Sequence, residues 1–300
     1  MTETSLSAFE SHRNYLMALA YRMLGSVSEA EDILQDAWLR WHHSDCAGVR
    51  NPRAYLAQVV SRLCLDRWNE ASRRRETYVG PWLPEPLAVA AETPSPEDSL
   101  DWDVSYALML ALERLSPLER AAFLLHDVFG VGFAEVAETL ARSEPACRQL
   151  AKRARSHIRR GRPRFEVTST DNRRIAEAFF TASRQGDESV LRDLLADHAM
   201  LHSDGGGVRY AALRVITGAD KLTRLFAALS RKTGAPEPLW ARFLMINGLP
   251  GLLTLEQDGL PQTVAVDIRN GQVRHIYLTR NPAKLLHLSA LMPDSPSPLH

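Results

Sequence analysis

The sequence predicts a multidomain protein in which two all-α domains, joined by an extended linker, are followed by an α+β domain. Residues 6–75 and 104–163 carry apolar side chains at helical spacing. Residues 76–103 between them are acidic and contain several prolines, and from 171 to 290 helical patterns give way to short apolar strands. We expect these boundaries for the three domains and the linker, and a disordered tail over 291–300.

The overall composition is that of an ordinary globular protein. The 300 residues are 45% hydrophobic and 24% charged, and 36 basic residues balance 36 acidic ones. The net charge of zero therefore points to no anionic partner, although local charge asymmetry still can. The N-terminus lacks a signal-peptide pattern, and no stretch approaches the roughly 20 apolar residues of a membrane span. We expect a cytoplasmic protein without membrane contact.

The three cysteines, Cys46, Cys64 and Cys147, lie far apart in the sequence. No pair has the spacing of a metal site or a redox motif, so we expect reduced thiols, mostly buried. The sequence predicts neither a metal nor a cofactor.

Residues 28–41, SEAEDILQDAWLRW, give the clearest helical pattern, and Ser28 is the expected N-cap. Its apolar stripe consists of Ala30, Ile33, Leu34, Ala37, Trp38 and Trp41. The residues that fall away from this stripe are Asp32, Gln35, Asp36 and Leu39. They form either a solvated acidic face or a docking surface for a basic partner.

A second helix is expected over residues 53–75, because Pro52 favours a helix start. Its apolar side consists of Tyr55, Leu56, Val59, Val60, Leu63 and Cys64. The other side carries Arg62, Asp66, Arg67, Arg73, Arg74 and Arg75. Arginines can bind phosphates, and the rings of Tyr55 and Trp68 can stack on unpaired bases. A single-stranded nucleic-acid surface and an ordinary basic helix both remain open.

The linker follows the arginine triplet directly with YVGPWLPEPL, residues 78–87. From Glu76 to Glu113 there are eight acidic residues and no basic one. Prolines keep such a segment extended. The segment is either a plain surface linker or a strap with a function of its own.

The second helical domain ends in a predicted helix-turn-helix. Helical patterns over 104–115 and 118–129, the latter stopped by Gly130, precede a unit at 133–160. Its turn is Ala141-Arg142-Ser143, with Ala141 where glycine is usual. Ser143 is the expected cap of the second helix, and Pro145 lies in its first turn.

The second helix of this unit is strongly basic, because nine basic residues and one acidic residue fall between Arg142 and Arg164. Its expected buried side is Cys147, Leu150, Ala151, Ala154 and Ile158. The residues expected to face DNA are Arg148, Gln149, Lys152, Arg153 and Arg155, since arginine and glutamine make bidentate base contacts. A basic amphipathic helix packed in a bundle is the alternative.

The C-terminal domain is predicted to combine helices with a curved antiparallel sheet. Helices are expected at 172–186, 188–196 and 219–233. Strands are expected at 199–203, 212–216, 239–246, 251–257, 262–269 and 273–279, with hairpin turns at "DGL" and "NGQ". The candidate acid–base residues are His198, His202, Asp204 and Asp267. No spacing forces any pair of them together, so we expect no catalytic residues and no enzyme.

The motifs together resemble a bacterial RNA polymerase sigma factor of the extracytoplasmic-function (ECF) type. AEDILQDAWLRW resembles the helix that docks on the polymerase β′ clamp, which implies a polymerase contact by Asp32, Gln35, Asp36 and Leu39. NPRAYLAQVVSRLCLDRWNEASRRR resembles the segment of region 2 that opens and reads the minus-ten element. This implies roles for Arg53, Tyr55, Arg62, Asp66, Arg67, Arg73, Arg74 and Arg75. FAEVAETLARSEPACRQLAKRAR resembles the region 4 reader of the minus-thirty-five element.

Three short motifs resemble the ECF subgroup with a fused SnoaL-like domain of the NTF2-like, cone-shaped fold. They are WLPEP, DGGG and NPAKL, the last with Ala283 where the subgroup usually has an acidic residue. The resemblance implies that this domain contacts region 2 or the linker and regulates the protein. The implied regulatory residues are Trp82, Leu83, Pro84, Asp204, Gly205, Gly206, Gly207, Asn281, Pro282, Lys284 and Leu285.

The resemblance implies a protein that binds core RNA polymerase, reads promoter DNA and starts transcription, with its activity modulated by the fused domain. The alternative is a helix-turn-helix DNA-binding regulator with a ligand-sensing NTF2-like domain and no polymerase role. An enzyme built on the C-terminal domain is the third possibility.

Overall fold

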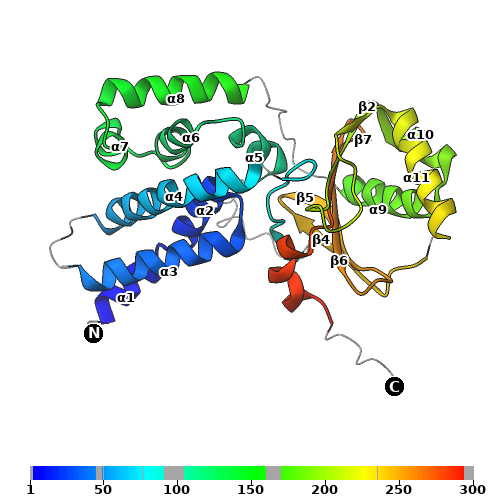
Figure 1. Ribbon diagram of the computed structural model, residues 1–300, viewed down its shortest axis with the longest axis horizontal. Coiled ribbons are helices and arrows are strands. Elements are labelled where there is room, and N and C mark those ends of the chain that lie inside the picture. The colour runs from blue at the N-terminus through cyan, green and yellow to red at the C-terminus, as the bar shows by residue number, and fades with distance from the viewer. Residues whose placement is uncertain are drawn as a thin grey trace. The chain divides into compact units, whose positions relative to one another are not determined.

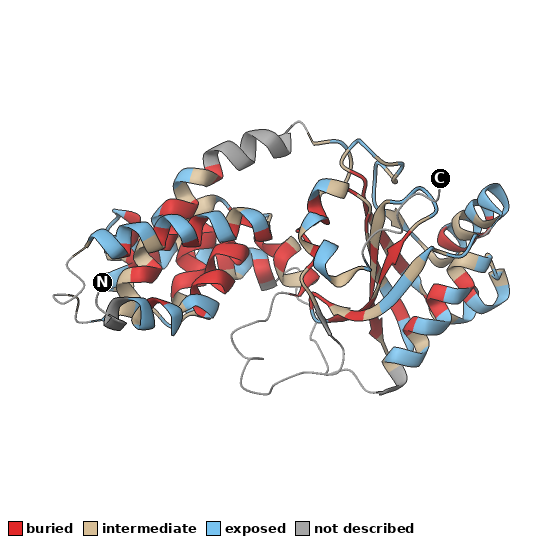
Figure 2. Cartoon of the chain, turned by 90° about the horizontal axis from the view of Figure 1, so that it is seen from below, coloured by how far each residue is buried: buried red, intermediate tan, exposed pale blue. Residues whose placement is uncertain are grey.

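The computed structural model describes residues 3–44, 49, 51–76, 78–90, 105–159, 170–234 and 236–293; side chains at 3–5, 69–76, 89–90, 159 and 170–171 are not described. The chain divides into two compact units. The first comprises residues 1–77 and 96–163, and the second comprises 78–95 and 164–300. Buried residues concentrate where the elements of each unit pack together (Figure 2).

The first unit is helical (Figure 1). Its helices are α1 Glu3–Glu10, α2 Arg13–Leu24, α3 Val27–His43, α4 Pro52–Glu76, α5 Tyr106–Leu112, α6 Pro117–Phe123, α7 Phe133–Leu140 and α8 Glu144–Arg159. A π-helical turn, η2, runs over Leu124–Val128 and continues α6. The helix expected over 118–129 is therefore α6 followed by this wider turn.

Most helix starts follow from local sequence, with one correction. The hydroxyl of Ser26, and not that of Ser28, accepts the Glu29 N–H and caps α3, so Ser28 lies inside the first turn. The Ser143 hydroxyl accepts the Ala146 N–H at 3.4 Å and caps α8, as expected. Asn51 caps α4 through its side-chain oxygen and the Ala54 N–H.

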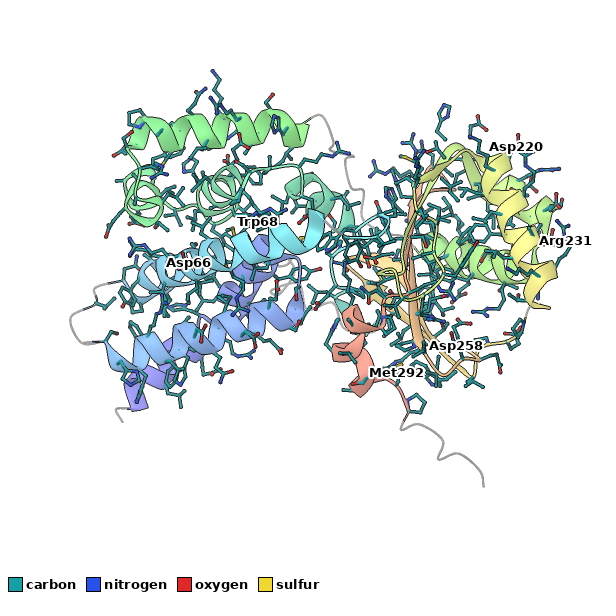
Figure 3. The ribbon with its side chains drawn as sticks, viewed as in Figure 1. Asp66, Trp68, Asp220, Arg231, Asp258 and Met292 are labelled. Carbon is teal, nitrogen blue, oxygen red and sulfur yellow. The ribbon has the colours of Figure 1, made fainter. Side chains whose placement is uncertain are left out.

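A buried arginine joins several helices of this unit. The guanidinium of Arg120, on α6, donates hydrogen bonds to the carbonyl oxygens of Met23 and Leu112 at 2.7 and 3.0 Å. It also pairs with the Glu113 carboxylate at 2.6 Å and lies 4.3 Å from the ring centroid of Trp68 on α4 (Figure 3). Its side chain is 0% exposed, so the guanidinium has lost its hydrogen bonds to water. The contacts within the protein replace them.

The second unit combines a seven-stranded sheet with three helices. The helices are α9 Thr170–Gln185, α10 Glu188–Leu194 and α11 Ala219–Thr233. The strands are β1 Ala88–Ala90, β2 Leu195–Asp204, β3 Ile216–Thr217, β4 Trp240–Ile246, β5 Leu249–Leu255, β6 Pro261–Arg269 and β7 Gln272–Thr279, in the order β1-β4-β5-β6-β7-β2-β3. Two short 3-10 helices follow, η3 Pro282–Lys284 and η4 Leu286–Leu291.

The sheet is mixed, which corrects the expected antiparallel arrangement. Strands β4 to β7 form antiparallel hairpins, whereas β2 pairs with β7 in parallel. Because β2 and β7 are far apart in the sequence, no tight turn forces them to run in opposite directions. Two strands differ from their expected bounds by more than two residues: β2 begins at Leu195, and only Ile216 of the expected strand 212–216 is in β3. Strand β1 was not expected.

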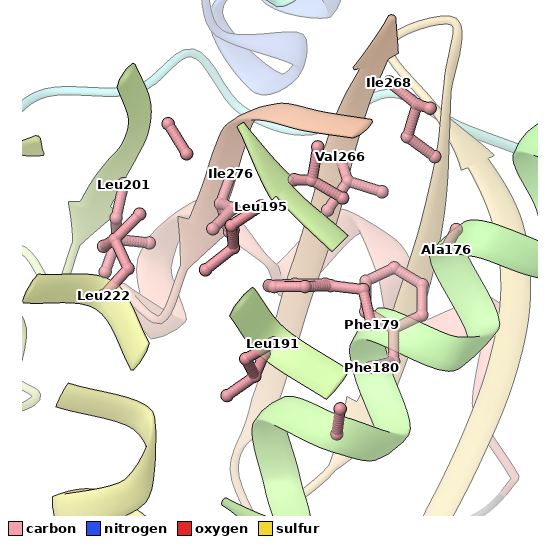
Figure 4. Packing of buried hydrophobic residues seen from close by; sticks show 13 residues of the cluster. Ala176, Phe179, Phe180, Leu191, Leu195, Leu201, Leu222, Val266, Ile268 and Ile276 are labelled. Carbon is pink, nitrogen blue, oxygen red and sulfur yellow. The ribbon is translucent and has the colours of Figure 1, made fainter. Parts of the chain in front are cut away.

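The core of this unit lies between one face of the sheet and the helices. Figure 1 shows α9, α10 and α11 on the same side of the strands. Phe179 and Phe180 of α9 pack with Leu201, Val266 and Ile276 of the sheet (Figure 4). Helices packed over one face of a curved sheet confirm the expected α+β cone.

Two cysteines are described, and both Cys64 and Cys147 are buried free thiols. Burial raises the pKa of each thiol above its ordinary value. Cys46 and residues 294–300, most of the expected disordered tail, lie outside the described residues.

Candidate functional site

The acidic face of α3 is open to solvent. Asp32, Gln35 and Asp36 are exposed, and Leu39 is 47% exposed although it is a large apolar side chain. The opposite stripe is buried, with Trp41 at 1% exposure. An amphipathic helix thus presents two carboxylates, an amide and a leucine on one free face, which suits contact with a second protein.

The expected nucleic-acid face of α4 is partly engaged within the first unit. Arg62 donates to the carbonyl oxygens of Glu138 and Thr139 at 2.9 and 3.2 Å, at the end of α7. Arg53 is exposed, and its guanidinium lies 4.2 Å from the ring centroid of Tyr15. Asp66 is exposed (Figure 3).

Other residues of α4 differ in accessibility. Arg67 is half-buried, and Tyr55 is half-buried against Trp41. Trp68 is only 6% exposed beneath Arg120, so the expectation that its ring can stack on a base is wrong for this conformation. Hydrophobic packing and a cation–π contact occupy its surface instead. The side chains of Arg73, Arg74 and Arg75 lie outside the described residues.

The expected reader helix α8 presents a basic surface. Gln149, Lys152 and Arg153 are exposed. Arg148 is also exposed, and it pairs with Glu144 at 2.9 Å. Arg155 is half-buried and pairs with the carboxylate of Asp127 at 2.6 Å.

The turn between α7 and α8 uses a left-handed alanine. Ala141 has φ 50° and ψ 49°, a conformation that costs an L-residue free energy and that glycine adopts freely. The turn nevertheless forms, because the Ala141 and Arg142 N–H groups bond to carbonyls of the last turn of α7.

Within the second unit, Asp204 at the end of β2 organises the segment 78–90. Its carboxylate accepts hydrogen bonds from the Tyr78 hydroxyl at 2.5 Å and the Leu83 N–H at 2.8 Å. The Lys284 ammonium contacts the same carboxylate at 2.8 Å and the Leu83 carbonyl oxygen at 2.5 Å. Asn281 donates from its side-chain amide to the Tyr78 hydroxyl at 2.9 Å. Five residues from three distant parts of the sequence thus form one buried polar cluster.

Electrostatics and packing reinforce this cluster. Burial, together with the hydrogen bond to the Asp204 carboxylate, raises the pKa of Tyr78, so its hydroxyl stays protonated and donates. The Lys284 ammonium lies 4.2 Å from the ring centroid of Trp82 and 4.8 Å from that of Tyr78.

The remaining motif residues line the same region. Leu83 and Leu285 are fully buried, Pro84 is buried, and Trp82 and Pro282 are half-buried. Ala283 is exposed and is not part of the polar cluster, although its N–H bonds to the Asn281 side chain.

Glycines let the loop after β2 pack closely against its neighbours. Gly206 has φ +63°, and a Cβ there would lie 2.3 Å from the side chain of Asn281. A Cβ on Gly205 would lie 2.1 Å from the Arg209 carbonyl oxygen. Gly207 has φ +73° and faces Val79, which is part of the same segment. Within the DGGG motif, Asp204 and Gly207 therefore contact the segment 78–90, whereas Gly205 and Gly206 allow close packing within the loop and against Asn281.

Several residues that hold this segment were not identified from the sequence. Leu87 and Asn247 exchange two hydrogen bonds, at 2.8 and 3.0 Å, and β1 then pairs with β4. A ring nitrogen of His287 lies 2.8 Å from the Pro86 carbonyl oxygen. The one available signal was Asn247-Gly248, a hairpin dipeptide that places Asn247 at φ 48°.

The candidate acid–base residues do not assemble into one site. His198 is exposed, and Asp204 belongs to the cluster described above. His202 stacks on Tyr277 with ring centroids 5.2 Å apart, and Asp267 pairs with Arg269 at 3.2 Å. None of the four lines the cavity between α9, α11 and the sheet.

Across the described ranges, no group of three or more His, Cys, Asp or Glu side chains is placed to hold a metal ion. In the same part of the chain, no helix is both long and apolar enough to cross a membrane.

Two family models match the chain in the same order as the helical regions expected from the sequence. The Sigma-70 region 2 model matches residues 8–74, which span α2, α3 and most of α4, and the Sigma-70 region 4 model matches residues 105–158, from α5 to α8.

Similar proteins extend over nearly the whole chain. The ECF RNA polymerase sigma factor SigJ of Mycobacterium tuberculosis (strain ATCC 25618 / H37Rv) is 38% identical over 291 residues, covering 93% of this chain and 92% of that protein. A probable ECF RNA polymerase sigma factor of the same strain, SigI, is 32% identical over 287 residues, covering 95% and 96%. The crystal structure of SigJ matches with a TM-score of 0.75 and 36% identity, over 94% of this chain and 98% of that one.

Both Sigma-70 regions are present in order, and a relative of 38% identity spans almost the full length. The protein therefore belongs to the ECF family of RNA polymerase sigma factors.

Proposed function

We propose that this sigma factor binds core RNA polymerase through the exposed face of α3 and directs it to specific promoters. The observation that supports the polymerase contact is the exposure of Asp32, Gln35, Asp36 and Leu39 on a helix whose other side is buried. The two carboxylates suit a basic surface such as the β′ clamp. The protein acts in the cytoplasm with the polymerase, and no step of this role is catalytic.

Promoter DNA is read by two surfaces in this proposal. The basic side of α4 binds the opened minus-ten strand, with Arg53, Arg62, Arg67 and the Arg73–Arg75 triplet on its phosphates and the half-buried ring of Tyr55 beside the bases. The exposed residues of α8 enter the major groove at the minus-thirty-five element. There Arg148 and Gln149 suit base edges, and Lys152, Arg153 and Arg155 suit phosphates.

Promoter binding requires the first unit to open. The two elements lie about 25 base pairs apart, or ~85 Å at ~3.4 Å per base pair. In the closed unit, Arg62 of α4 is hydrogen-bonded to the end of α7 and Arg120 of α6 to α2. We infer that the compact form is the free protein and that polymerase separates the two helical regions.

The fused domain modulates this opening by holding the segment 78–90. This segment belongs to the connection between α4 and α5, and it is fixed to the second unit by Asp204, Lys284 and Asn247. A connection that is ordered in this way has less freedom to follow the separating helical regions. Release of the segment is therefore expected to change transcript yield.

Retention on immobilised core enzyme tests the polymerase contact. The double variant Asp32→Lys/Asp36→Lys reverses two exposed charges on α3 and should lose retention while keeping its circular dichroism spectrum. The double variant Asp193→Lys/Asp197→Lys makes the same charge change at two exposed positions of the second unit and should bind as the wild type. Equal retention of all three chains would refute the α3 contact. Specific duplex binding without any affinity for polymerase would favour a stand-alone regulator.

A further inference from the structure

The second unit contains a cavity of about 230 Å³ between α9, α11 and the facing strands. Its apolar lining includes Phe179, Phe180, Phe226, Leu252, Val264 and Ile276. The cavity is partly open to solvent, so a small molecule can enter it. A dry engineered cavity of about 150 Å³ is enough to bind benzene. This cavity therefore has room for an aromatic ring with a short chain.

One side of the cavity carries a satisfied ion pair. Arg184 and Glu256 both line it, and they are joined by a hydrogen bond of 2.9 Å. The Thr254 hydroxyl also donates to Glu256, at 2.6 Å. Burial alone would raise the pKa of Glu256, but the hydrogen bonds from Arg184 and Thr254 hold it below its ordinary value. Glu256 is thus an anion that already has its partners.

Arg280 lines the same cavity, but the hydrogen bonds of its guanidinium are incomplete. One of its terminal nitrogens donates to the Tyr210 carbonyl oxygen at 2.6 Å. Its Nε–H is buried and has no hydrogen-bond partner among the residues that the structure describes. A buried donor on a charged group without an acceptor is costly. An acceptor from outside the chain would remove this cost if the Arg280 side chain turned its Nε–H toward the cavity.

The charges around Arg280 leave a positive surplus. Arg184 pairs with Glu256, and Arg209 pairs with Asp258 at 2.6 Å. Within the described ranges, Arg280 makes no direct ion pair, although the Glu256 and Asp258 carboxylates both attract its charge. Arg184, Arg209 and Arg280 thus share two carboxylates, of which Glu256 lines the cavity and Asp258 does not, and one further negative charge would restore the balance.

We propose that this cavity binds a small amphipathic carboxylic acid, with its hydrocarbon part among the phenylalanines and its carboxylate on Arg280. A single negative charge fits, because a dianion would lose far more hydration energy on entering an apolar cavity. A neutral molecule of the same shape would leave the Arg280 Nε–H without an acceptor. The site is independent of the proposed polymerase and promoter contacts.

Isothermal titration of the full-length protein with two matched probes tests this site. The probes are 3-phenylpropionate and 3-phenylpropan-1-ol, which share a ring and a chain and differ in the anionic group. The acid should bind at least about tenfold more tightly than the alcohol, the equivalent of ~1.4 kcal/mol. Arg280→Leu should abolish that preference, and Arg280→Lys should keep part of it.

Arg274→Leu removes an exposed arginine from β7 and serves as the matched control, with wild-type affinity expected for both probes. Equal affinity of the wild type for acid and alcohol would overturn the carboxylate assignment. So would unchanged acid binding by Arg280→Leu, or no binding of either probe by the wild type. Because the measurement needs no polymerase, its failure is distinct from failure of the transcription role.

Discussion

The Lys284 ammonium lies 2.8 Å from the Asp204 carboxylate, and their side chains are 10% and 0% exposed. The pair joins the end of β2 to η3, and both partners also bond to Leu83 in the segment 78–90. A buried pair of this kind depends on both members, because the loss of one leaves the other charged, buried and uncompensated.

Asp204→Asn should release the segment and destabilise the second unit. Removal of one partner from a buried ion pair costs about 3–5 kcal/mol. Hydrogen exchange should accelerate at the Leu83 amide and its neighbours, and the free energy of unfolding should fall. Asp197→Asn, an exposed change on the same strand, should affect neither measurement. Unaltered protection of residues 78–90 in Asp204→Asn would show that this carboxylate does not hold them.

Arg120→Lys should destabilise the first unit despite conservation of charge. Lysine cannot reproduce the planar set of bonds to Met23, Leu112 and Glu113, nor the stacking on Trp68. We expect the free energy of unfolding in urea to fall by roughly 2–4 kcal/mol. Arg114→Lys, an exposed neighbour, should change it by less than about 0.5 kcal/mol. Similar values for the two variants would contradict this role of Arg120.

Ala141→Gly should stabilise the protein, because the left-handed backbone at this position strains alanine and suits glycine. The expected gain is roughly 0.5–1 kcal/mol, since the greater freedom of glycine in the unfolded chain offsets part of the relief. Ala134→Gly, at an exposed position inside α7, should destabilise by a similar amount. Thermal melts that shift in the same direction for both variants would refute the strain.

Tyr78 should ionise later than an ordinary tyrosine. Its pKa is raised in the folded protein, so its contribution to stability is complete below a pH of about 10 and is lost as pH rises through the raised value. Ultraviolet difference titration of the wild type minus Tyr78→Phe should give a single tyrosinate that forms above pH ~10. A difference curve centred at or below pH ~10 would mean that Tyr78 is not bonded to Asp204 in solution.

Much of the molecule could be predicted from its sequence. Local patterns determine the helices α3, α4, α8 and α11, the hairpins among β4 to β7 and the exposure of Asp32 and Asp36. The motifs were sufficient for the family. They were also sufficient to associate Asp204, Lys284 and Leu83 with one contact region, although their regulatory role stays a prediction.

The parts that could not be predicted depend on tertiary contacts. The short strand β1 forms because Leu87 bonds to Asn247 and β1 pairs with β4, and nothing in the sequence PLAVA (residues 86–90) indicates these partners. Burial of Trp68 depends on Arg120, which lies far away in the sequence. The parallel pairing of β2 with β7 and the cavity lined by Arg280 likewise arise from residues that only the fold brings together.

Run-off transcription with purified core RNA polymerase on a library of promoter fragments is the decisive measurement. With the wild-type chain added, we expect transcripts that begin at defined positions on a subset of fragments. Asp32→Lys/Asp36→Lys should give none, and Asp193→Lys/Asp197→Lys should give the wild-type set. Transcripts no different from those of core enzyme alone would contradict the assignment of this chain as a promoter-directing subunit.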